Sequence, residues 1–403
     1  MSELPCEVSE LIMVRDRRSD GATKRRKEGG SVAVHRCVAA SFVAAALAAG
    51  PGCAVSRVPQ APRAAAWIPG DKAVPRVTVY GSLGRLLPAY DETPALERFL
   101  YGPAPGRSGA AALRNPQGMT FTQGRILVCD QGFPDILAID PATGRIASFG
   151  DSAHPPRCPV DITADVEGRT YVADTTLRAV LLYGADQRFL AELRPPGLAP
   201  ESFRPCSVLV HGGILYVGNL AGRRLDRFDV ARETWLPPFA PSGTALPLIA
   251  PTGLAAGPAG ELLVVDALQG VVQRVTAEGR WLIPIGRPGR GAGQFVRPKQ
   301  IRCTASRLIF VSDAGRQSVL VFDATGSFLF EIGGDAVEGG RFSLPVGLVT
   351  LRTSDLPVLA GRLAEHPELA SEECVIVSDS LGGESLVVIG VVARAAEDGT
   401  DAH

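Results

Sequence analysis

The sequence has few of the groups from which most enzyme centres are built. Among its 403 residues there are only five histidines, and His154, His211 and His366, the three outside the two ends, fall in unrelated loops and turns. It contains no Cys-x-x-Cys pair, no Gly-x-Ser-x-Gly segment and no Gly-rich phosphate loop. These absences argue against a histidine-built zinc site, an esterase-type serine nucleophile and a nucleotide-binding enzyme.

The sequence also lacks an excess of either charge. Its 41 Lys and Arg almost balance 42 Asp and Glu, which leaves a net charge of −1. So small a charge gives no overall field toward nucleic acid, and we predict no nucleic-acid partner. Aromatic residues are scarce at 6%, whereas 45 Gly and 32 Pro indicate a globular chain with many turns.

The most apolar segment is too short to span a bilayer. Residues 37–50 form a 14-residue apolar run of signal-peptide length behind a basic region, and the run leads into Gly50-Pro51-Gly52-Cys53-Ala54. This end resembles the cleavage box of bacterial lipoproteins, with Cys53 as the lipidated residue. We predict an export signal over residues 1–53 and a tether over residues 54–74. The expected location is the periplasmic face of a bacterial membrane, and the alternative is a soluble periplasmic or secreted protein.

One pattern recurs six times along the rest of the chain. Each repeat begins at a proline, and its second apolar strand ends in Asp or Asn. The prolines, spaced 43, 46, 46, 47 and 47 residues apart, are Pro116, Pro159, Pro205, Pro251, Pro298 and Pro345. The strand-ending residues are Asp130, Asp174, Asn219, Asp266, Asp313 and Asp379. A period of about 40 to 50 residues with four short strands predicts the blades of a β-propeller.

The sixth repeat lacks its fourth strand. Residues 76–82, RVTVYGS, have the character of that strand but precede the first repeat. Pairing them with the last repeat would close the ring and remove an open sheet edge. We therefore predict an all-β, six-bladed β-propeller over residues 75–393, followed by an acidic tail over residues 394–403.

Two insertions interrupt the pattern. One covers residues 84–114, with a helix expected near Thr93, and the other covers about residues 351–372. Such insertions lie on propeller rims, so they are either partner-contacting elements or plain surface loops.

The repeats resemble the NHL family of six-bladed propellers. The resemblance is carried by residues 291–334, which have a Gly-x-Gly-x-Phe-x-x-Pro lead, a Val-x-Asp strand end, Arg316 and a Phe-Asp-x-x-Gly turn. It covers about residues 75–393, implies the fold rather than an activity, and extends to exported bacterial propeller lipoproteins. Asn219, in place of Asp, departs from the pattern, as does the near absence of the family's Asn before the Arg.

The six strand-ending Asp and Asn residues have two interpretations. They can accept hydrogen bonds from backbone amides of the following turn, which is a structural role. The alternative is a ring of functional carboxylates. We predict the structural role.

The residues that flank the prolines are candidates for the mouth of the central channel. By the family pattern these are Asn115, Gln117, Asp161, Arg204, Ser207, Arg297, Lys299 and Gln300. Arg204, Arg297 and Lys299 form a modest basic patch that could receive a carboxylate or an acidic peptide. The alternative is that they are solvated loop ends.

These observations favour a monomeric, lipid-anchored scaffold that binds a protein or a small ligand at this face, without metal or cofactor. The alternative is a metal-dependent lactonase-like hydrolase or lyase. The resemblance to such propellers implies a metal held by Glu, Asn and Asp on inner strands, and here those strands offer Asp161 alone.

The cysteines of the repeats also have two interpretations. Cys158 and Cys206 begin the inner strands of adjacent blades and could form a disulfide. The alternative is that Cys129, Cys158, Cys206, Cys303 and Cys374 are small buried hydrophobic residues.

Overall fold

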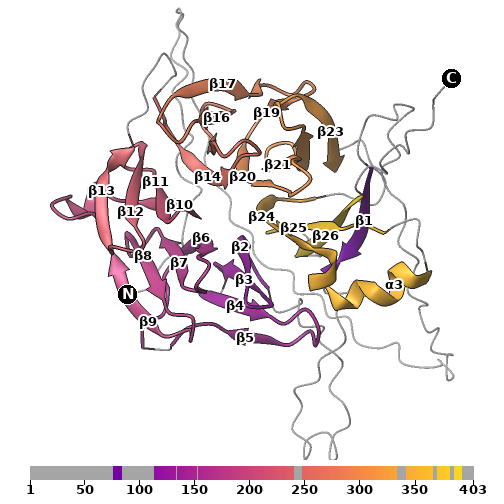
Figure 1. Cartoon of the computed structure of the whole chain (residues 1–403), viewed down its shortest axis with the longest axis horizontal. Helices are drawn as coiled ribbons and strands as arrows, with labels where there is room; N and C mark the ends of the chain where they lie inside the picture. The colour runs from indigo at the N-terminus through magenta and orange to yellow at the C-terminus, as the bar shows by residue number, and fades with distance from the viewer. Residues whose placement is uncertain are drawn as a thin grey trace, which may run out of the picture. The chain divides into compact units, whose positions relative to one another are not determined.

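Six antiparallel sheets of four strands form the six blades of the propeller (Figure 1). The computed structural model describes residues 76–83, 113–132, 134–151, 153–239, 247–333, 342–365, 370–381 and 385–392. The expected export signal, tether, helix near Thr93 and acidic tail lie outside the described residues. No helix in the described ranges is long and apolar enough to cross a membrane.

Every blade repeats the same order of strands from the axis outward. The inner strands, each starting at a predicted proline, are β2 (Pro116–Thr122), β6 (Pro159–Ala164), β10 (Pro205–His211), β14 (Pro251–Ala256), β20 (Pro298–Cys303) and β24 (Pro345–Arg352). The second strands, each ending at a predicted Asp or Asn, are β3 (Arg125–Asp130), β7 (Thr170–Asp174), β11 (Ile214–Asn219), β15 (Leu262–Asp266), β21 (Ile309–Asp313) and β25 (Glu373–Asp379).

The third and fourth strands complete each sheet. The third strands are β4 (Asp135–Ile139), β8 (Ala179–Tyr183), β12 (Arg224–Asp229), β16 (Val271–Val275), β22 (Ser318–Phe322) and β26 (Leu386–Val392). The outer strands are β5 (Ile146–Ser148), β9 (Phe189–Leu193), β13 (Thr234–Phe239), β17 (Trp281–Ile285), β23 (Phe328–Gly333) and β1 (Arg76–Ser82). A short parallel pair, β18 (Arg287–Pro288) with β19 (Gln294–Phe295), and a 3-10 turn, η2 (Pro200–Ser202), lie between blades.

The inner strands form a closed ring. β2 contacts β6, and the contacts continue through β10, β14, β20 and β24 back to β2. Second strands such as β7, β15 and β21 are buried along their whole length, because both faces of each sheet are covered by neighbouring blades. The predicted six-bladed architecture is therefore confirmed.

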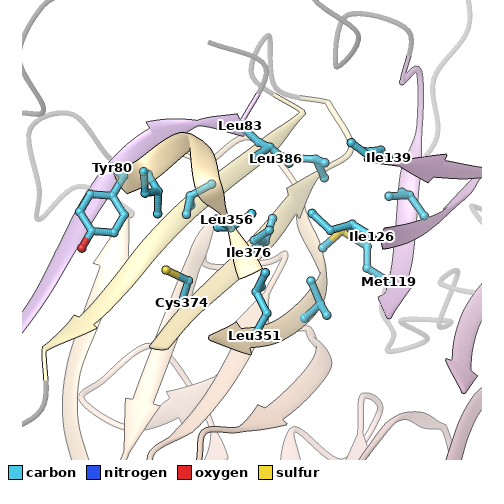
Figure 2. Packing of buried hydrophobic residues seen from close by; sticks show 14 of the residues in the cluster. Tyr80, Leu83, Met119, Ile126, Ile139, Leu351, Leu356, Cys374, Ile376 and Leu386 are labelled. Carbon is cyan, nitrogen blue, oxygen red and sulfur yellow. The ribbon is translucent and has the colours of Figure 1, made fainter. Parts of the chain in front are cut away.

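The chain closes the ring with its first described strand. β1 pairs antiparallel with β26, from Arg76 opposite Val392 to Ser82 opposite Val387, as the sequence predicted. Figure 2 shows Tyr80 and Leu83 packed with residues of the last blade and, farther along the same cluster, with Met119 and Ile126 of the first blade. The closing strand thus supplies part of the core between the two ends of the repeat.

The insertion of the last blade is anchored in the same core. It forms η3 (Thr353–Asp355), η4 (Pro357–Leu359) and helix α3 (Ala360–Glu365). Leu356 and Leu359 within it are fully buried in the cluster that contains Tyr80 and Met119. This part of the insertion is therefore a packed element of the propeller as well as a rim segment.

Candidate binding site at the channel mouth

One face of the propeller carries the prolines, the segments that precede them and the turns between second and third strands. We call it the proline face. The two features meet there because each proline pairs with the Asp or Asn that ends its neighbouring second strand, as Pro251 does with Asp266. The opposite face carries the remaining strand turns. The candidate site lies where the channel opens on the proline face.

A repeated hydrogen-bond clamp holds the backbone of the proline face in place. In every blade the residue after the Asp or Asn donates its N–H to the carbonyl of the residue before the proline, as Ala267 does to Ala250 at 3.0 Å. The Asp or Asn side chain accepts N–H groups from that same segment. Asp313 accepts from Val296 at 2.7 Å and Arg297 at 2.9 Å, and also from the following turn.

The hydrogen-bond clamp involves more backbone amides than the sequence predicted. The prediction placed the accepted amides in the turn after the strand, and the structure adds those of the segment before the proline. For Asp379 the described donors are Ser343 and Leu344, both in that segment. The clamp residues are buried and their carboxylates are engaged by backbone amides, so they hold the loops that carry the site.

Asn219 completes the clamp of the third blade with a different bond. Its carbonyl oxygen accepts from Arg204 N–H at 3.1 Å and Gly222 N–H at 3.0 Å. Its Nδ2 donates to Ser202 O at 3.0 Å and to the buried Asp226 Oδ2 at 2.8 Å. The amide is needed here because a second carboxylate would face Asp226.

Each inner strand begins with an irregularity in strand pairing that determines how deeply its first side chains are buried. Pairing with the second strand shifts register just after the proline in all six blades. As a result the first residue after the proline is half-buried and the next one is buried. The six half-buried residues, which we call the mouth ring, are Gln117, Val160, Cys206, Thr252, Lys299 and Val346. The buried residues below them are Gly118, Asp161, Ser207, Gly253, Gln300 and Gly347.

Below the mouth ring, polar side chains cross the channel. Gln300 Nε2 donates to Asp161 Oδ1 at 2.9 Å, and Asp161 Oδ2 accepts from Val208 N–H at 2.9 Å. Asp161 belongs to the second blade and Gln300 to the fifth, so this bond joins opposite blades. Gly118 and Gly347 make room for the crossing: a Cβ on Gly118 would lie 2.4 Å from Asp161 Oδ1, and one on Gly347 would lie 2.0 Å from Gln117 O.

Arg302 extends this crossing toward the opposite face. Its Nη1 donates to Ile301 O at 2.8 Å and Leu254 O at 3.2 Å, and its Nη2 donates to Met119 O at 3.3 Å. Burial raises the pKa of Asp161, and Arg302 and the donors to Asp161 oppose that rise. Burial lowers the pKa of Arg302, and Asp161 opposes that change. The two charges therefore stabilise each other inside the channel.

At the mouth itself, Lys299 is a charged side chain with a lowered pKa and no ion pair in the described structure. Burial, followed by the neighbouring Arg297, lowers the pKa of Lys299, whereas Asp313 and Cys206 act in the opposite direction. Asp313 forms no direct ion pair with Lys299, and both of its oxygens accept backbone amides. Within the described residues the Lys299 ammonium has no ion pair and no hydrogen bond.

The predicted site residues fall at three levels. Arg297 is exposed, and Asn115, Arg204 and Lys299 are half-buried at the mouth. Asp161, Ser207 and Gln300 lie below the mouth, where Ser207 Oγ donates to Pro251 O at 2.6 Å. Their polar groups are bonded within the protein, so the structure does not present these three to a ligand at the mouth.

Sequence reasoning did not place Thr252 and Cys206 at the mouth or Arg302 in the channel. Thr252 and Cys206 directly follow a proline, as Gln117 and Lys299 do, and that position is a signal the sequence contains. Thr252 Oγ1 is buried and has no hydrogen-bond partner in the described structure. Arg302 could not be assigned from the repeat, because its hydrogen bonds reach the fourth and first blades.

Neither cysteine interpretation holds in full, because Cys158 is disulfide-bonded but not to Cys206. Cys206 is a free thiol that donates to Pro251 O at 3.1 Å and Gly218 O at 3.3 Å, so it forms no disulfide with Cys158. Burial raises the pKa of Cys206 to about 12, which keeps the thiol protonated. Cys129 and Cys374 are buried free thiols, and Cys206 and Cys303 are partly exposed ones.

Known structures share the fold at low sequence identity. A Bacteroides thetaiotaomicron protein of unknown function matches at a TM-score of 0.52 with 11% identity, over 78% of this chain and 75% of its own. A proposed gluconolactonase matches at 0.51 with 15% identity, over 72% of this chain and 93% of its own. A streptogramin B lyase matches at 0.48 with 15% identity, over 70% and 95%. No family model matches the sequence, and no curated protein sequence matches it. These likenesses establish the propeller fold alone.

Proposed function

We propose that this propeller is a binding module whose proline face holds an acidic segment of a partner protein. The observation that carries the proposal is Lys299, an ammonium at the channel mouth that forms no direct ion pair in the described structure. Arg297 acts on it electrostatically, and Arg204 lies on the same face; both belong to segments that precede a proline. Cations that a protein leaves uncompensated at one opening attract anionic groups there.

Exposed apolar side chains on the same face favour a protein partner over a free ion. Leu268 and Leu381 are 54% and 73% exposed in the turns between second and third strands, and Val296 is 38% exposed before Pro298. Aliphatic contacts beside a basic patch suit a segment in which acidic and apolar residues are mixed. The NHL-type repeat is part of this proposal, and the shared clamp in all six blades supports it.

The test uses an acidic peptide that contains leucine, such as N-acetyl-Glu-Glu-Leu-Glu-Glu-Leu-Glu-Glu, and the full chain. We expect Arg204→Glu with Arg297→Glu to weaken binding at least about tenfold at low salt, because charge reversal repels the peptide. Arg145→Glu, in the exposed turn between β4 and β5 on the opposite face, is the matched control. Equal affinity of the double variant and the control would refute the proposal.

The alternative, a metal-dependent lactonase-like hydrolase or lyase, fits the site less well. No three His, Cys, Asp or Glu side chains of the described residues come together as metal ligands. Asp161, the residue expected to serve such a centre, already accepts a bond at each oxygen. A purified protein that holds one divalent metal, and loses it in Asp161→Ala, would favour the enzyme instead.

Anchoring at Cys53 is a separate part of the proposal, supported by the sequence alone. We propose that lipidation there holds the propeller at the periplasmic face of a membrane. Processing that is blocked by globomycin, together with release of Cys53→Ala from the membrane fraction, is the expected result. Unchanged membrane association of Cys53→Ala would contradict it.

A further inference from the structure

Lys299 is the only lysine from Arg76 to the C-terminus. The other three lysines of the chain are Lys24, Lys27 and Lys72, so every other cationic side chain of the propeller, histidine aside, is arginine. Arginine presents a planar fork of donors, whereas lysine presents a compact, strongly hydrated charge. The propeller therefore has a compact ammonium charge at only one place, Lys299 at the mouth of its channel.

The neighbours of Lys299 in the mouth ring define one side of the channel mouth. Cys206 lies two blades away from Lys299 in the mouth ring. The residue between them in the ring is Thr252 of the fourth blade. The inner strands are in close contact here, since a Cβ on Gly253 would lie 2.8 Å from Lys299 O. Lys299, Thr252 and Cys206 thus form one side of the mouth.

Two donors on this side lack acceptors. The Lys299 ammonium has no described partner, and Thr252 Oγ1 is buried without one. The polar group on the other side is satisfied: Gln117 Nε2 donates to Asn115 Oδ1 at 2.8 Å and Ser380 Oγ at 3.1 Å. The missing acceptor therefore belongs next to Thr252 and Lys299.

We infer that this side of the mouth is a binding site for a single carboxylate group, which accepts from the Lys299 ammonium and the Thr252 hydroxyl. A carboxylate has one negative charge and two acceptor oxygens, which matches one ammonium and one hydroxyl. A phosphate would bring more charge and more acceptors than these two donors satisfy. Val160 and Val346 in the same ring supply apolar wall for the carbon attached to the carboxylate. The inference rests on the proposed function and narrows it to one contact.

Chemical labelling of the full chain tests the site directly. An amine-acylating reagent is applied, and acylation of Lys299 and Lys72 is measured by mass spectrometry. We expect sodium propionate in the millimolar range to slow acylation of Lys299 at least about fivefold and to leave Lys72 unchanged. Sodium phosphate at equal ionic strength should have little effect. Equal protection by phosphate, or none by propionate, would overturn the carboxylate assignment.

Variants test the two donors. Thr252→Val keeps the shape and removes the hydroxyl, and we expect it to weaken propionate binding about fivefold in calorimetry. Lys299→Met should reduce binding at least about tenfold, and Arg145→Met, on the opposite face, should leave it unchanged. Unaltered affinity in Thr252→Val and Lys299→Met would overturn the inference.

The acidic peptide described above separates this site from the proposed function. Peptide binding that depends on Arg204 and Arg297 but not on Lys299 or Thr252, without propionate protection, would refute the carboxylate site and leave the proposed function standing. Propionate protection without peptide binding would support the site and refute the acidic-protein partner.

Discussion

We expect Lys299 to reduce the stability of the fold, because burial disfavours its charged form. It is half-buried, its pKa is lowered first by burial and then by Arg297, and the carboxylate of Asp313 is occupied by backbone amides. A charge that is partly removed from water without a direct ion pair costs free energy. Side chains kept at such a cost are typical of binding sites, where stability and function compete.

We therefore predict that Lys299→Met raises the free energy of unfolding at pH 7, by roughly 0.5–1 kcal/mol. The folded-state pKa is lower than the ordinary value of 10.5, so the unfolded chain binds more protons between the two values. The contribution of Lys299 to stability thus rises with pH through this window.

Urea unfolding of both proteins from pH 7 to 10.5 measures this difference. The gap between Lys299→Met and the native chain should shrink as pH rises, because the lysine becomes neutral in the folded state first. The other groups that face Lys299, namely Arg297, Asp313 and Cys206, are the same in both proteins. A destabilised variant, or a gap that widens with pH, would show that Lys299 has a structural role.

Asn219 illustrates how one residue can depart from a repeat for a local reason. It is fully buried, and its amide donates to Asp226, which is 2% exposed and paired with Arg224 Nε at 2.7 Å. We predict that Asn219→Asp destabilises the protein by about 2–4 kcal/mol at pH 7, because two carboxylates would share one buried site.

The loss should diminish toward pH 4 to 5, where the pair can hold a proton. The swapped variant Asn219→Asp with Asp226→Asn is the control, since it again places one amide beside one carboxylate. Chemical unfolding at the two pH values measures both effects. A pH-independent loss, or a swap that recovers nothing, would contradict the explanation by paired carboxylates.

At the scale of elements, the sequence predicted where the strands begin and how they pair, but not the directions of their side chains. All six inner strands begin at the predicted prolines, and β1 pairs with β26, because these features follow from a local pattern and its period. The side-chain directions in the mouth ring depend instead on a register shift after each proline. The regular alternation of side chains along a strand does not predict such a shift. Thr252 was missed, and Ser207 and Gln300 were expected at the mouth, for this reason.

The outer strands show how exposed edges are kept from pairing. β13 contains Pro237 and Pro238, and β17 contains Pro284, each of which lacks the N–H that a further strand would need. β5 is only three residues long. β1 has no such protection, and its partner β26 would be an open edge without it.

We predict that a chain starting at residue 84 is destabilised by more than about 4 kcal/mol relative to one starting at residue 75. The shorter chain loses Val77, Val79, Tyr80 and Leu83, all of which are buried in clusters at the last blade. It also exposes β26 as an edge that can associate with another copy. Urea unfolding and size-exclusion chromatography measure both effects, and equal stability with equal elution would refute the closing role of β1.

At the scale of the whole molecule, the channel is where distant parts of the sequence meet. Asp161 and Gln300 are 139 residues apart and join the second blade to the fifth. Arg302 adds bonds to carbonyls of the fourth and first blades. No repeat pattern could have indicated these pairs, because the position of Asp161 and Gln300 is Ser207 in the third blade and Gly in the other three. Only the closed ring brings these residues together, and the opposite charges of Asp161 and Arg302 then stabilise the ring from within the channel.

The charged pair in the channel gives the last prediction. We expect Asp161→Asn to destabilise the protein by about 2–4 kcal/mol, since Arg302 loses its buried counter-charge and a donor would face the N–H of Val208 or the amide of Gln300. Arg302→Met alone should also destabilise, because Asp161 then remains charged without the guanidinium. The double variant should cost less than the sum of the two by about 1–2 kcal/mol. Chemical unfolding of the four proteins measures this coupling. If the two losses simply add, the charges do not act together, and the hydrogen bonds of Asp161 and Arg302 alone connect the blades across the channel.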